Sequence, residues 1–489
     1  MTLWELVERR SRDAPGAASV LFENQKLTNR EFHDRALSVA RGLAGLGIGR
    51  GDVVAVQLPN IPEYLLSYAA ICALGATLQP VHMPYRRAEL ATLLGHSEAR
   101  AFICLSRLKE ERPPGLKNVV SLGEPEAGAI AFSSLVSAPA LGRVPEGSPE
   151  DRFLLLYTSG TTDNPKGVPH AQRGFLANAM ASVPELEISK EEIVLSAAPL
   201  THLYGLYAYH VSLCSGAAMS LLPAFTPPDL AKVIEKHRAS CVFAGPAHFK
   251  PLLDGGLLER HDFSSLRFAC LSGSPVPPEL AAAVEKKLPG GKTIQLWGMT
   301  ELQAGSFSRP SDPAEVRHGS AGAATPGTEL RVVDERLQVR GISLFSGYLK
   351  NEKATREAFT PEGWFETGDT AELSAAGHLR FTGRVKEIIN RGGVKYSPLD
   401  VEAIIDRMPG VARSAIVPYP DAVLGERACV FVQPAPGAPA ATLEAIMREL
   451  DRAGVAKFKW PERLELLQAM PLTPTQKVMR GRLRELLKR

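Results

Sequence analysis

Apolar strand-like and helix-like segments alternate through the N-terminal part of the chain, and this alternation restricts the possible folds severely. Residues 52–58 have the composition of a buried strand, 61–74 that of a helix and 76–81 that of a second strand. A strand, a helix and a strand in this order form a βαβ unit with parallel strands. Further strands are expected at 101–105, 152–157, 193–197, 218–222, 241–244, 268–272 and 293–296, and a helix at 228–238. The pattern predicts an α/β fold built mainly on parallel sheets.

The C-terminal part of the chain has a different pattern. After about residue 320, short strands at 330–333, 337–340 and 378–381 predict a small β subdomain. Helices and strands then alternate again from residue 399. A glycine and three charged residues precede a new apolar strand at 388–389, so we place a domain boundary between residues 384 and 385. A length of 489 residues exceeds what one hydrophobic core organises, which agrees with a multidomain chain.

Charge and cysteine usage limit the class of protein. The net charge of +3 comes from 56 basic and 53 acidic residues that are mixed along the chain, so we expect no nucleic-acid partner. The six cysteines show neither metal-ligand nor disulfide spacing, which favours a reducing compartment, and we expect a cytoplasmic location. The first residues do not resemble a secretory signal. The longest uncharged stretches contain glycine and proline, so we expect no integral membrane contact.

A loop rich in hydroxyl groups and glycine follows the strand expected at 152–157. It can wrap a polyphosphate, because glycine lets the backbone approach closely, hydroxyl and N–H groups donate hydrogen bonds, and Lys166 supplies positive charge. It is not a Walker P-loop, since Pro165 stands where that motif has its second glycine. A polar surface turn is the alternative interpretation. The predicted phosphate-binding residues are Thr158, Ser159, Gly160, Thr161, Thr162 and Lys166.

This loop resembles the phosphate loop of the adenylate-forming superfamily, which comprises acyl-CoA synthetases, adenylation domains and firefly luciferase. Further motifs follow in the family's order from about Val53 to Leu483. The resemblance implies an N-terminal domain, residues 1–384, of two α/β subdomains and a small β-barrel-like subdomain, and a smaller mobile α+β domain, residues 385–489. It also implies an ATP-dependent ligase that joins a carboxylic acid to coenzyme A through acyl-AMP and uses Mg²⁺. The sequence at residues 383–396 and 419–428 resembles that of ligases for aromatic and alicyclic acids.

Three further motifs resemble the family's nucleotide and catalytic segments. An aromatic face at Trp297 can stack on adenine, although most family members have tyrosine there. Glu301 offers the hard oxygen that Mg²⁺ prefers. Lys477 resembles the lysine that drives adenylation, because a carboxylate and an anionic α-phosphate repel each other unless a cation bridges them. The residues implied by the resemblance are Ser274, Trp297, Gly298, Asp369 and Arg384 for ATP, Thr300, Glu301 and Lys477 for catalysis, and Lys386 as the hinge between the domains.

Two residues depart from the family's pattern. Asp163 and Gln476 occupy positions where the family commonly has glycine. Asp163 would bring negative charge close to the phosphates unless its side chain points away. Gln476 immediately precedes the catalytic lysine, so it affects the geometry of that loop. Both departures leave open a non-catalytic nucleotide-binding protein.

The segment 199–205 resembles the lining of the family's acyl pocket. No Asp or Glu occurs from 199 to 223, which disfavours an α-amino acid because its buried ammonium would lack a counter-charge. An aromatic, alicyclic or medium-chain acid is expected. His202 is also predicted as a catalytic residue, and a histidine satisfied within the core is the alternative. The predicted acyl-binding residues are His202, Leu203, Tyr204, Phe243, Gly245, Ser272, Gly273, Leu296 and Gly298.

Gly392 and Gly393 resemble the loop that lines the pantetheine tunnel during thioester formation. Two glycines suit a thiol that must pass bare backbone. A carrier-protein phosphopantetheine presents the same thiol as free coenzyme A, so an enzyme that loads a carrier protein is the alternative function. We expect a monomer or a homodimer.

Overall fold

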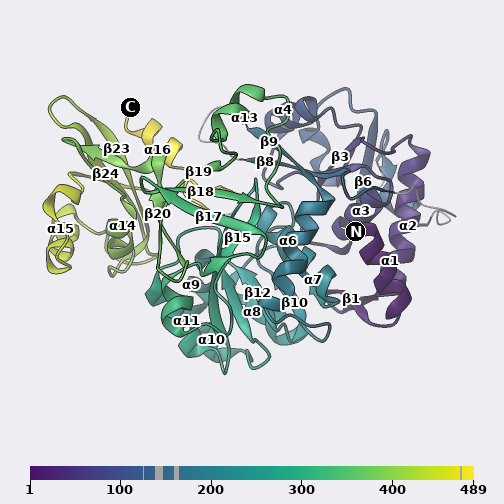
Figure 1. Ribbon diagram of the computed structural model, residues 1–489, viewed down its shortest axis with the longest axis horizontal. Helices are drawn as coiled ribbons and strands as arrows, with labels where there is room; N and C mark the ends of the chain where they lie inside the picture. The colour runs from purple at the N-terminus through teal and green to yellow at the C-terminus, as the bar shows by residue number, and fades with distance from the viewer. Residues whose placement is uncertain (125, 138–146, 159–164, 474–475, 489) are drawn as a thin grey trace. The chain divides into compact units, whose positions relative to one another are not determined.

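The computed structural model describes residues 1–124, 126–137, 147–158, 165–473 and 476–488, and its contacts divide the chain into two compact units (Figure 1). The first unit comprises Met1–Glu329 and Arg340–Gly363, and the second comprises Leu330–Val339 and Trp364–Arg489. This division does not identify a hinge, so the domain boundary after residue 384 and the hinge at Lys386 stay predictions. No helix within the described ranges combines the length and the apolar character that a membrane crossing requires.

A seven-stranded sheet in the first unit contains the βαβ unit that the sequence predicts. Its strand order is β7-β6-β5-β3-β4-β8-β9, and β3 pairs in parallel with both β4 and β5. Among the described residues of this sheet, the antiparallel pair is β8 and β9. The strands are β3 (Val53–Gln57), β4 (Thr77–Pro80), β5 (Ala101–Leu105), β6 (Asn118–Leu122), β7 (Ile130–Ala131), β8 (Arg152–Thr158) and β9 (Lys166–Ala171), and α3 (Pro62–Ala73) connects β3 to β4.

A nine-stranded sheet forms the other half of this unit. Its order is β16-β15-β14-β13-β12-β10-β11-β1-β2, and the strands from β14 to β1 are parallel. The prediction of mainly parallel sheets is therefore confirmed. The strands are β1 (Ala18–Phe22), β2 (Gln25–Thr28), β10 (Ile193–Ser196), β11 (Ala218–Ser220), β12 (Cys241–Ala244), β13 (Phe268–Leu271), β14 (Lys292–Met299), β15 (Gln303–Phe307) and β16 (Ala323–Ala324).

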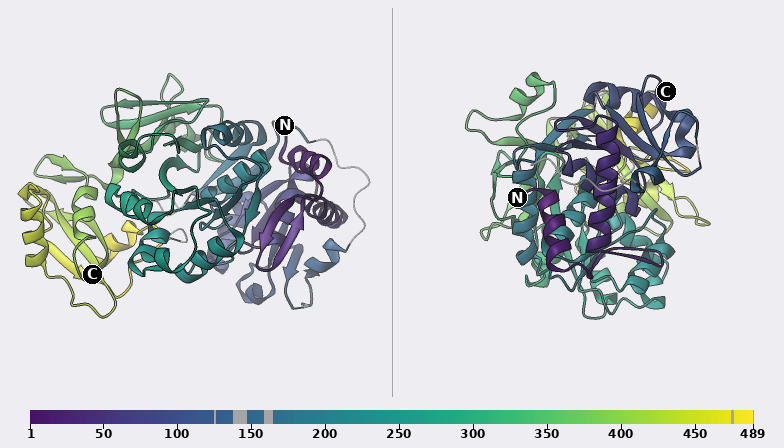
Figure 2. Two further views of the ribbon diagram at one scale, coloured as in Figure 1. Left: turned by 90° about the horizontal axis from the view of Figure 1, so that it is seen from below. Right: turned by 90° about the vertical axis from the view of Figure 1, so that its right-hand side faces the viewer.

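Helices α3 and α7 (Leu203–Ser215) belong to the core that joins the two sheets. Both helices are apolar around most of their circumference, which is the pattern of a helix that is buried on all sides. One continuous apolar cluster contains side chains of these helices together with strands of both sheets. The N-terminal helices α1 (Leu3–Asp13) and α2 (Asn29–Gly45) pack against each other and against α3 (Figure 2). The remaining helices of the first unit are α4 (Arg87–Ser97), α5 (Phe132–Val136), α6 (Gln172–Glu185), α8 (Pro227–His237), α9 (Pro246–Asp254), α10 (Leu257–Arg260), α11 (Pro278–Lys287), α12 (Ala314–Gly319) and α13 (Glu352–Ala358).

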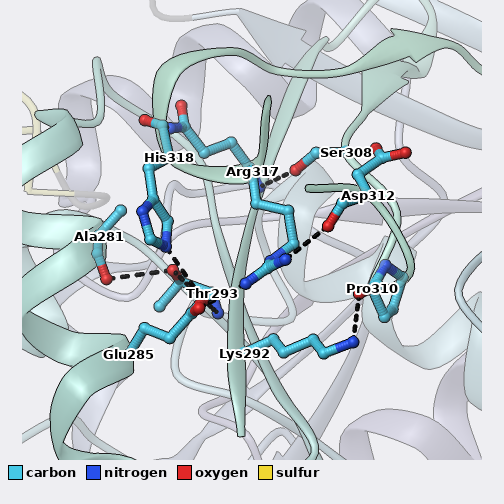
Figure 3. Close-up of polar contacts among 10 residues, drawn as sticks. Ala281, Glu285, Lys292, Thr293, Ser308, Pro310, Asp312, Arg317 and His318 are labelled. Carbon is cyan, nitrogen blue, oxygen red and sulfur yellow. Dashed lines mark hydrogen bonds and ion pairs between the residues drawn. The ribbon is translucent and has the colours of Figure 1, made fainter. Parts of the chain in front are cut away.

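A cluster of charged side chains fastens α11 and α12 to the start of β14 (Figure 3). The Glu285 carboxylate accepts a hydrogen bond from the backbone N–H of Thr293 at 2.7 Å. It also pairs with Arg317 and with Nε2 of His318, the latter at 3.0 Å. These hydrogen bonds lower the pKa of Glu285 although burial opposes them. The cluster fixes the strand whose opposite end carries Trp297.

The second unit contains two sheets. The expected small β subdomain is a four-stranded sheet in the order β17-β18-β19-β20. The other sheet has the order β22-β21-β24-β23, with β25 beside β24. Helices α14 and α15 cover one face of it, and α16 covers the other. The elements are β17 (Thr328–Val333), β18 (Arg336–Gly341), β19 (Phe365–Leu373), β20 (Leu379–Arg384), β21 (Ile389–Arg391), β22 (Val394–Tyr396), β23 (Val411–Asp421), β24 (Gly425–Pro434), β25 (Arg463–Leu466), α14 (Leu399–Ile405), α15 (Leu443–Arg452) and α16 (Arg480–Leu486).

Candidate active site

The predicted phosphate loop connects the two strands of the β8–β9 hairpin. Thr158 and Lys166 are paired in register at the neck of the hairpin, so their side chains lie on the same face. Both are half-buried. Lys166 therefore starts the returning strand instead of lying within the loop. The other predicted phosphate contacts, Ser159, Gly160, Thr161 and Thr162, lie outside the described residues, as does Asp163.

Lys166 and Glu301 meet around Tyr348, a residue that the sequence interpretation did not identify. The Lys166 ammonium lies 4.5 Å from the centre of the Tyr348 ring, a cation–π distance. The Tyr348 hydroxyl donates a hydrogen bond to Oε1 of Glu301 at 2.9 Å. Burial and the neighbouring Glu301 raise the pKa of Tyr348, so the hydroxyl stays protonated and remains a donor. The predicted phosphate lysine and the predicted metal carboxylate thus contact one side chain.

Thr300 is bonded to the strand that follows the phosphate loop. His170, on β9, is buried, and its Nε2 lies 2.7 Å from the backbone oxygen of Thr300. Burial lowers the pKa of His170 to about 4, so the ring is neutral at pH 7 and donates through an Nε2–H. The sequence interpretation missed His170 because the two residues are far apart in the chain.

Trp297 is buried, with 7% of its surface exposed, and its ring covers Gly305 of the adjacent strand β15. A Cβ at Gly305 would collide with the ring, so only glycine fits beneath it. Gly298 is restricted in the same way, because a Cβ there would collide with the carbonyl of Gln303. Stacking of Trp297 on adenine stays a prediction.

The predicted acyl-binding residues lie at the carboxyl ends of neighbouring parallel strands. Phe243 lies one residue before the end of β12, and Ser272 directly follows β13. Leu296 directly follows the last residue of β14 that pairs in parallel with β13. In α/β sheets ligands bind at this edge. Tyr204 joins the group, because its hydroxyl donates to the Cys270 carbonyl at 2.7 Å and its ring meets the edge of Phe243. Three other predicted wall residues lie nearby in the chain: Leu203 begins α7, Gly245 follows β12 and Gly273 follows β13. Ser274, which is predicted to bind ATP, comes next after Gly273.

His202 caps helix α7. Its Nδ1 accepts a hydrogen bond from the backbone N–H of Tyr204 at 3.2 Å. Its ring stacks against His82 with centroids 6.3 Å apart, and Nδ1 of His82 lies 2.9 Å from the Thr201 hydroxyl. Burial lowers the pKa of His82 to about 4. The cap gives His202 a structural role, and a catalytic role for it stays a prediction.

Asp369 and Arg384 form the predicted ribose site within the second unit. They are paired in register on β19 and β20, and Nε of Arg384 lies 3.1 Å from Oδ1 of Asp369. Asp369 is buried, whereas Arg384 is exposed. Gly368, with φ of 74°, lies within β19 directly before the carboxylate, where the pairing of β18 and β19 shifts in register.

Lys477 lies in a tight turn of the same unit. Its backbone N–H donates to the Thr473 hydroxyl at 3.1 Å. Burial and, to a smaller extent, the neighbouring Arg384 lower the pKa of Lys477 to about 8, although Asp369 and Glu387 oppose the shift. The predicted catalytic lysine and the predicted ribose pair therefore share one electrostatic environment.

Gln476 adopts a backbone conformation that suits glycine. Its φ is 65°, in the left-handed region, and its carbonyl accepts a hydrogen bond from Arg413 at 2.8 Å. A side chain in this region costs about 1–2 kcal/mol relative to the ordinary conformation. The turn thus has the backbone that a glycine would allow, and Gln476 is held there under strain.

Gly392 and Gly393 form the two-residue turn between β21 and β22. Their φ values are 60° and 86°, as in a type I′ hairpin turn, which requires positive φ at both positions. The Gly392 N–H donates to the Leu424 carbonyl at 2.8 Å. Both glycines are exposed at the tip of the hairpin.

The predicted hinge residue is attached to the C-terminal helix. Arg484 donates to the Lys386 carbonyl at 3.0 Å, and Arg480 lies 3.0 Å from the Glu387 carboxylate. Arg480 also binds both carboxylate oxygens of Glu402, at 2.6 and 2.7 Å. These ion pairs connect the segment around Lys386 to the base of the Lys477 turn.

Family models match the chain in two parts. The model described as AMP-binding enzyme matches residues 7–349, and that of the AMP-binding enzyme C-terminal domain matches residues 400–477. Among solved structures, an anthranilate CoA ligase, AuaEII, has a TM-score of 0.92 at 24% identity and covers 100% of this chain and 97% of its own. ATP-bound MatB from Rhodopseudomonas palustris has a TM-score of 0.88 at 26% identity, with 100% and 99% covered.

Three of the curated relatives that match nearly the whole chain illustrate the similarity. A CoA ligase of Mycobacterium tuberculosis for a methyl-dioxo-octahydro-indenyl propanoyl group is 30% identical over 98% of this chain and 98% of its own. A medium-chain fatty-acid–CoA ligase of Escherichia coli is 29% identical over 92% and 84%. A 2,3-dihydroxybenzoate-AMP ligase of Bacillus subtilis is 31% identical over 99% and 93%.

Proposed function

The chain belongs to the AMP-binding enzyme family, and we propose that it is an ATP-dependent ligase that joins a carboxylic acid to coenzyme A through acyl-AMP. The observation that carries this proposal is the common environment of Lys477, Asp369 and Arg384. A cation that senses the charge of the carboxylate proposed for the ribose could act on the α-phosphate of the same nucleotide. The matching relatives act as acid–thiol ligases or form acyl-AMP according to their names.

In the first half-reaction the substrate carboxylate attacks the α-phosphorus of ATP, and pyrophosphate leaves. Both reactants are anionic, so their approach needs positive charge at the reacting oxygens. We assign this role to Lys477, and the binding of the polyphosphate to Lys166 and the hydroxyl of Thr158. Asp369 would accept hydrogen bonds from the ribose hydroxyls. Positioned charges of this kind lower the barrier because they need not reorganise during the reaction.

The donor set around Glu301 fits Mg²⁺. Mg²⁺ prefers oxygen ligands and keeps several waters and substrate phosphates, so one or two protein carboxylates suffice. Glu301 is buried, with 6% of its surface exposed, and Tyr348 orients it. No cluster of three metal-ligating side chains occurs among the residues that the structure describes, which suits a metal held mainly by ATP. Bound Mg²⁺ would neutralise phosphate charge.

In the second half-reaction the thiolate of coenzyme A attacks the acyl carbon, and AMP leaves. We propose that a rotation about Lys386 exchanges Lys477 for the hairpin tip at Gly392 and Gly393. The tip has no side chains, so a thiol can pass close to the backbone there. A carrier-protein phosphopantetheine is the alternative acceptor.

We propose an aromatic, alicyclic or medium-chain acid as the substrate. The residues proposed as pocket walls are mostly apolar or small, and the Tyr204 hydroxyl donates a hydrogen bond to the Cys270 carbonyl. Phe243 is fully buried beside it. We also propose a cytoplasmic location, since all six cysteines are free and five of them are buried.

A screen of pyrophosphate release tests this function. Purified protein is given ATP, Mg²⁺ and aromatic, alicyclic or straight-chain acids, with coenzyme A, with a carrier protein or without acceptor. We expect acid-dependent pyrophosphate release with at least one class, and an acyl-CoA product when coenzyme A is present. Tight ATP binding without acid-dependent release would instead identify a non-catalytic nucleotide-binding protein.

A further inference from the structure

We propose that Tyr348 is a positioning residue that holds Glu301 and Lys166 in the geometry required by metal-bound ATP. The inference rests on the proposed function, because it takes Glu301 as the metal carboxylate and Lys166 as a phosphate contact. Tyr348 contacts both side chains, through its hydroxyl at 2.9 Å and its ring at 4.5 Å.

The backbone around Tyr348 is bonded to both predicted motifs. The N–H of Phe345 donates to the backbone carbonyl of Glu301 at 2.8 Å. The N–H of Leu349 donates to the carbonyl of Gly167 at 2.9 Å, one residue beyond Lys166. The segment 345–349 therefore joins the start of β9 to the loop after β14, which places Tyr348 between its two partners.

The ring of Tyr348 is itself held in place. The backbone N–H of Tyr348 donates to the Thr355 hydroxyl of α13 at 2.9 Å. The Tyr348 ring packs edge-on against the Phe345 ring, with centroids 4.8 Å apart. Gly347 permits this approach, because a Cβ there would lie 2.7 Å from the Thr355 methyl group. A side chain fixed in this way can determine the orientation of the groups that it touches.

The two contacts serve different purposes. A carboxylate offers about four lone-pair positions, so one hydrogen bond from Tyr348 orients Glu301 without exhausting its capacity to bind a cation. The aromatic face holds the Lys166 ammonium without neutralising it, which an acidic partner would do. The lysine consequently keeps its full charge for a phosphate. Loss of the hydroxyl of a purely structural tyrosine would not affect metal binding.

The test separates the hydroxyl from the ring. Calorimetry measures the binding of ATP, without acid substrate, as a function of Mg²⁺ concentration. For Tyr348→Phe we expect the Mg²⁺ concentration at half-maximal effect to rise about threefold to tenfold, with metal-free ATP binding unchanged. Tyr348→Leu should in addition weaken metal-free ATP binding, because Lys166 loses its aromatic support.

Tyr64→Phe is the matched control, since the Tyr64 hydroxyl is fully buried and donates to the Leu200 carbonyl at the same distance of 2.9 Å. It should leave the Mg²⁺ dependence unchanged. A double-mutant cycle adds Glu301→Gln, and in that background Tyr348→Phe should have little further effect. An unchanged Mg²⁺ dependence in Tyr348→Phe, or an equal change in Tyr64→Phe, overturns the inference. Failure of the proposed function would appear separately, as absence of acid-dependent pyrophosphate release in the unaltered protein.

Discussion

Nε2 of His170 lies 2.7 Å from the carbonyl oxygen of Thr300, and this hydrogen bond joins the hairpin of the phosphate loop to the segment that carries Glu301. The His170 ring also packs against Phe175, with centroids 4.2 Å apart. Because burial lowers the pKa of His170 to about 4, the imidazole is a neutral hydrogen-bond donor at pH 7.

Replacement of His170 should therefore affect nucleotide binding more than acid binding. In His170→Leu the half-buried Thr300 carbonyl loses its partner, which costs about 1 kcal/mol of unfolding free energy. We expect the KM for ATP to rise at least severalfold while the KM for the acid changes little. His170→Gln, which keeps a donor, should recover part of the loss. Denaturant unfolding and steady-state kinetics measure both effects, and equal changes in the two KM values would contradict this role.

Gln476→Gly should increase the rate of acyl-AMP formation. Glycine adopts a φ of 65° without the steric cost that glutamine has there. Relief of about 1 kcal/mol in the reacting conformation, beyond the relief in the resting one, makes acyl-AMP formation about fivefold faster. Gln476→Ala keeps a Cβ and should give no increase. Rapid-quench measurement of acyl-AMP tests the pair, and equal rates for both variants would show that backbone strain does not limit the loop.

The pH dependence of the first half-reaction should reflect Lys477. Its pKa of about 8 means that the charged form, which the reaction needs, is present below pH 8 and is lost above it. We expect kcat/KM for acyl-AMP formation to fall above about pH 8 by up to tenfold per pH unit. Lys477→Arg should have lower activity but no fall in this range, because its guanidinium stays charged. If kcat/KM fell at the same alkaline pH in the unaltered protein and in Lys477→Arg, this assignment would be excluded.

The sequence predicts those parts of the site that depend on local pattern. Phe243, Ser272 and Leu296 were identified by resemblance, and the predicted strands account for their proximity because the ends of parallel strands gather at one edge of a sheet. Gly392 and Gly393 were also identified by resemblance, and the type I′ turn that they form agrees with their composition because it requires positive φ at both positions.

Other parts of the site depend on tertiary contacts that no local pattern encodes. Tyr348 is 47 residues from Glu301 in sequence, and His170 is 130 residues from Thr300. A tyrosine beside a glycine, or a histidine in a strand, is usually a packing residue. Lys477 was identified only by resemblance, because an isolated lysine near a basic C-terminal segment has no distinguishing spacing.

The most direct test of the account separates the two half-reactions in Lys477→Ala. Acyl-AMP formation is followed by pyrophosphate release from ATP and acid, and thioester formation is followed from supplied acyl-AMP and coenzyme A. We predict that acyl-AMP formation falls about 100-fold or more, as for other losses of a charge-stabilising group, while thioester formation stays within about twofold of the unaltered protein. An equal loss in both half-reactions, or acyl-AMP formation at the unaltered rate, would contradict the central role of Lys477.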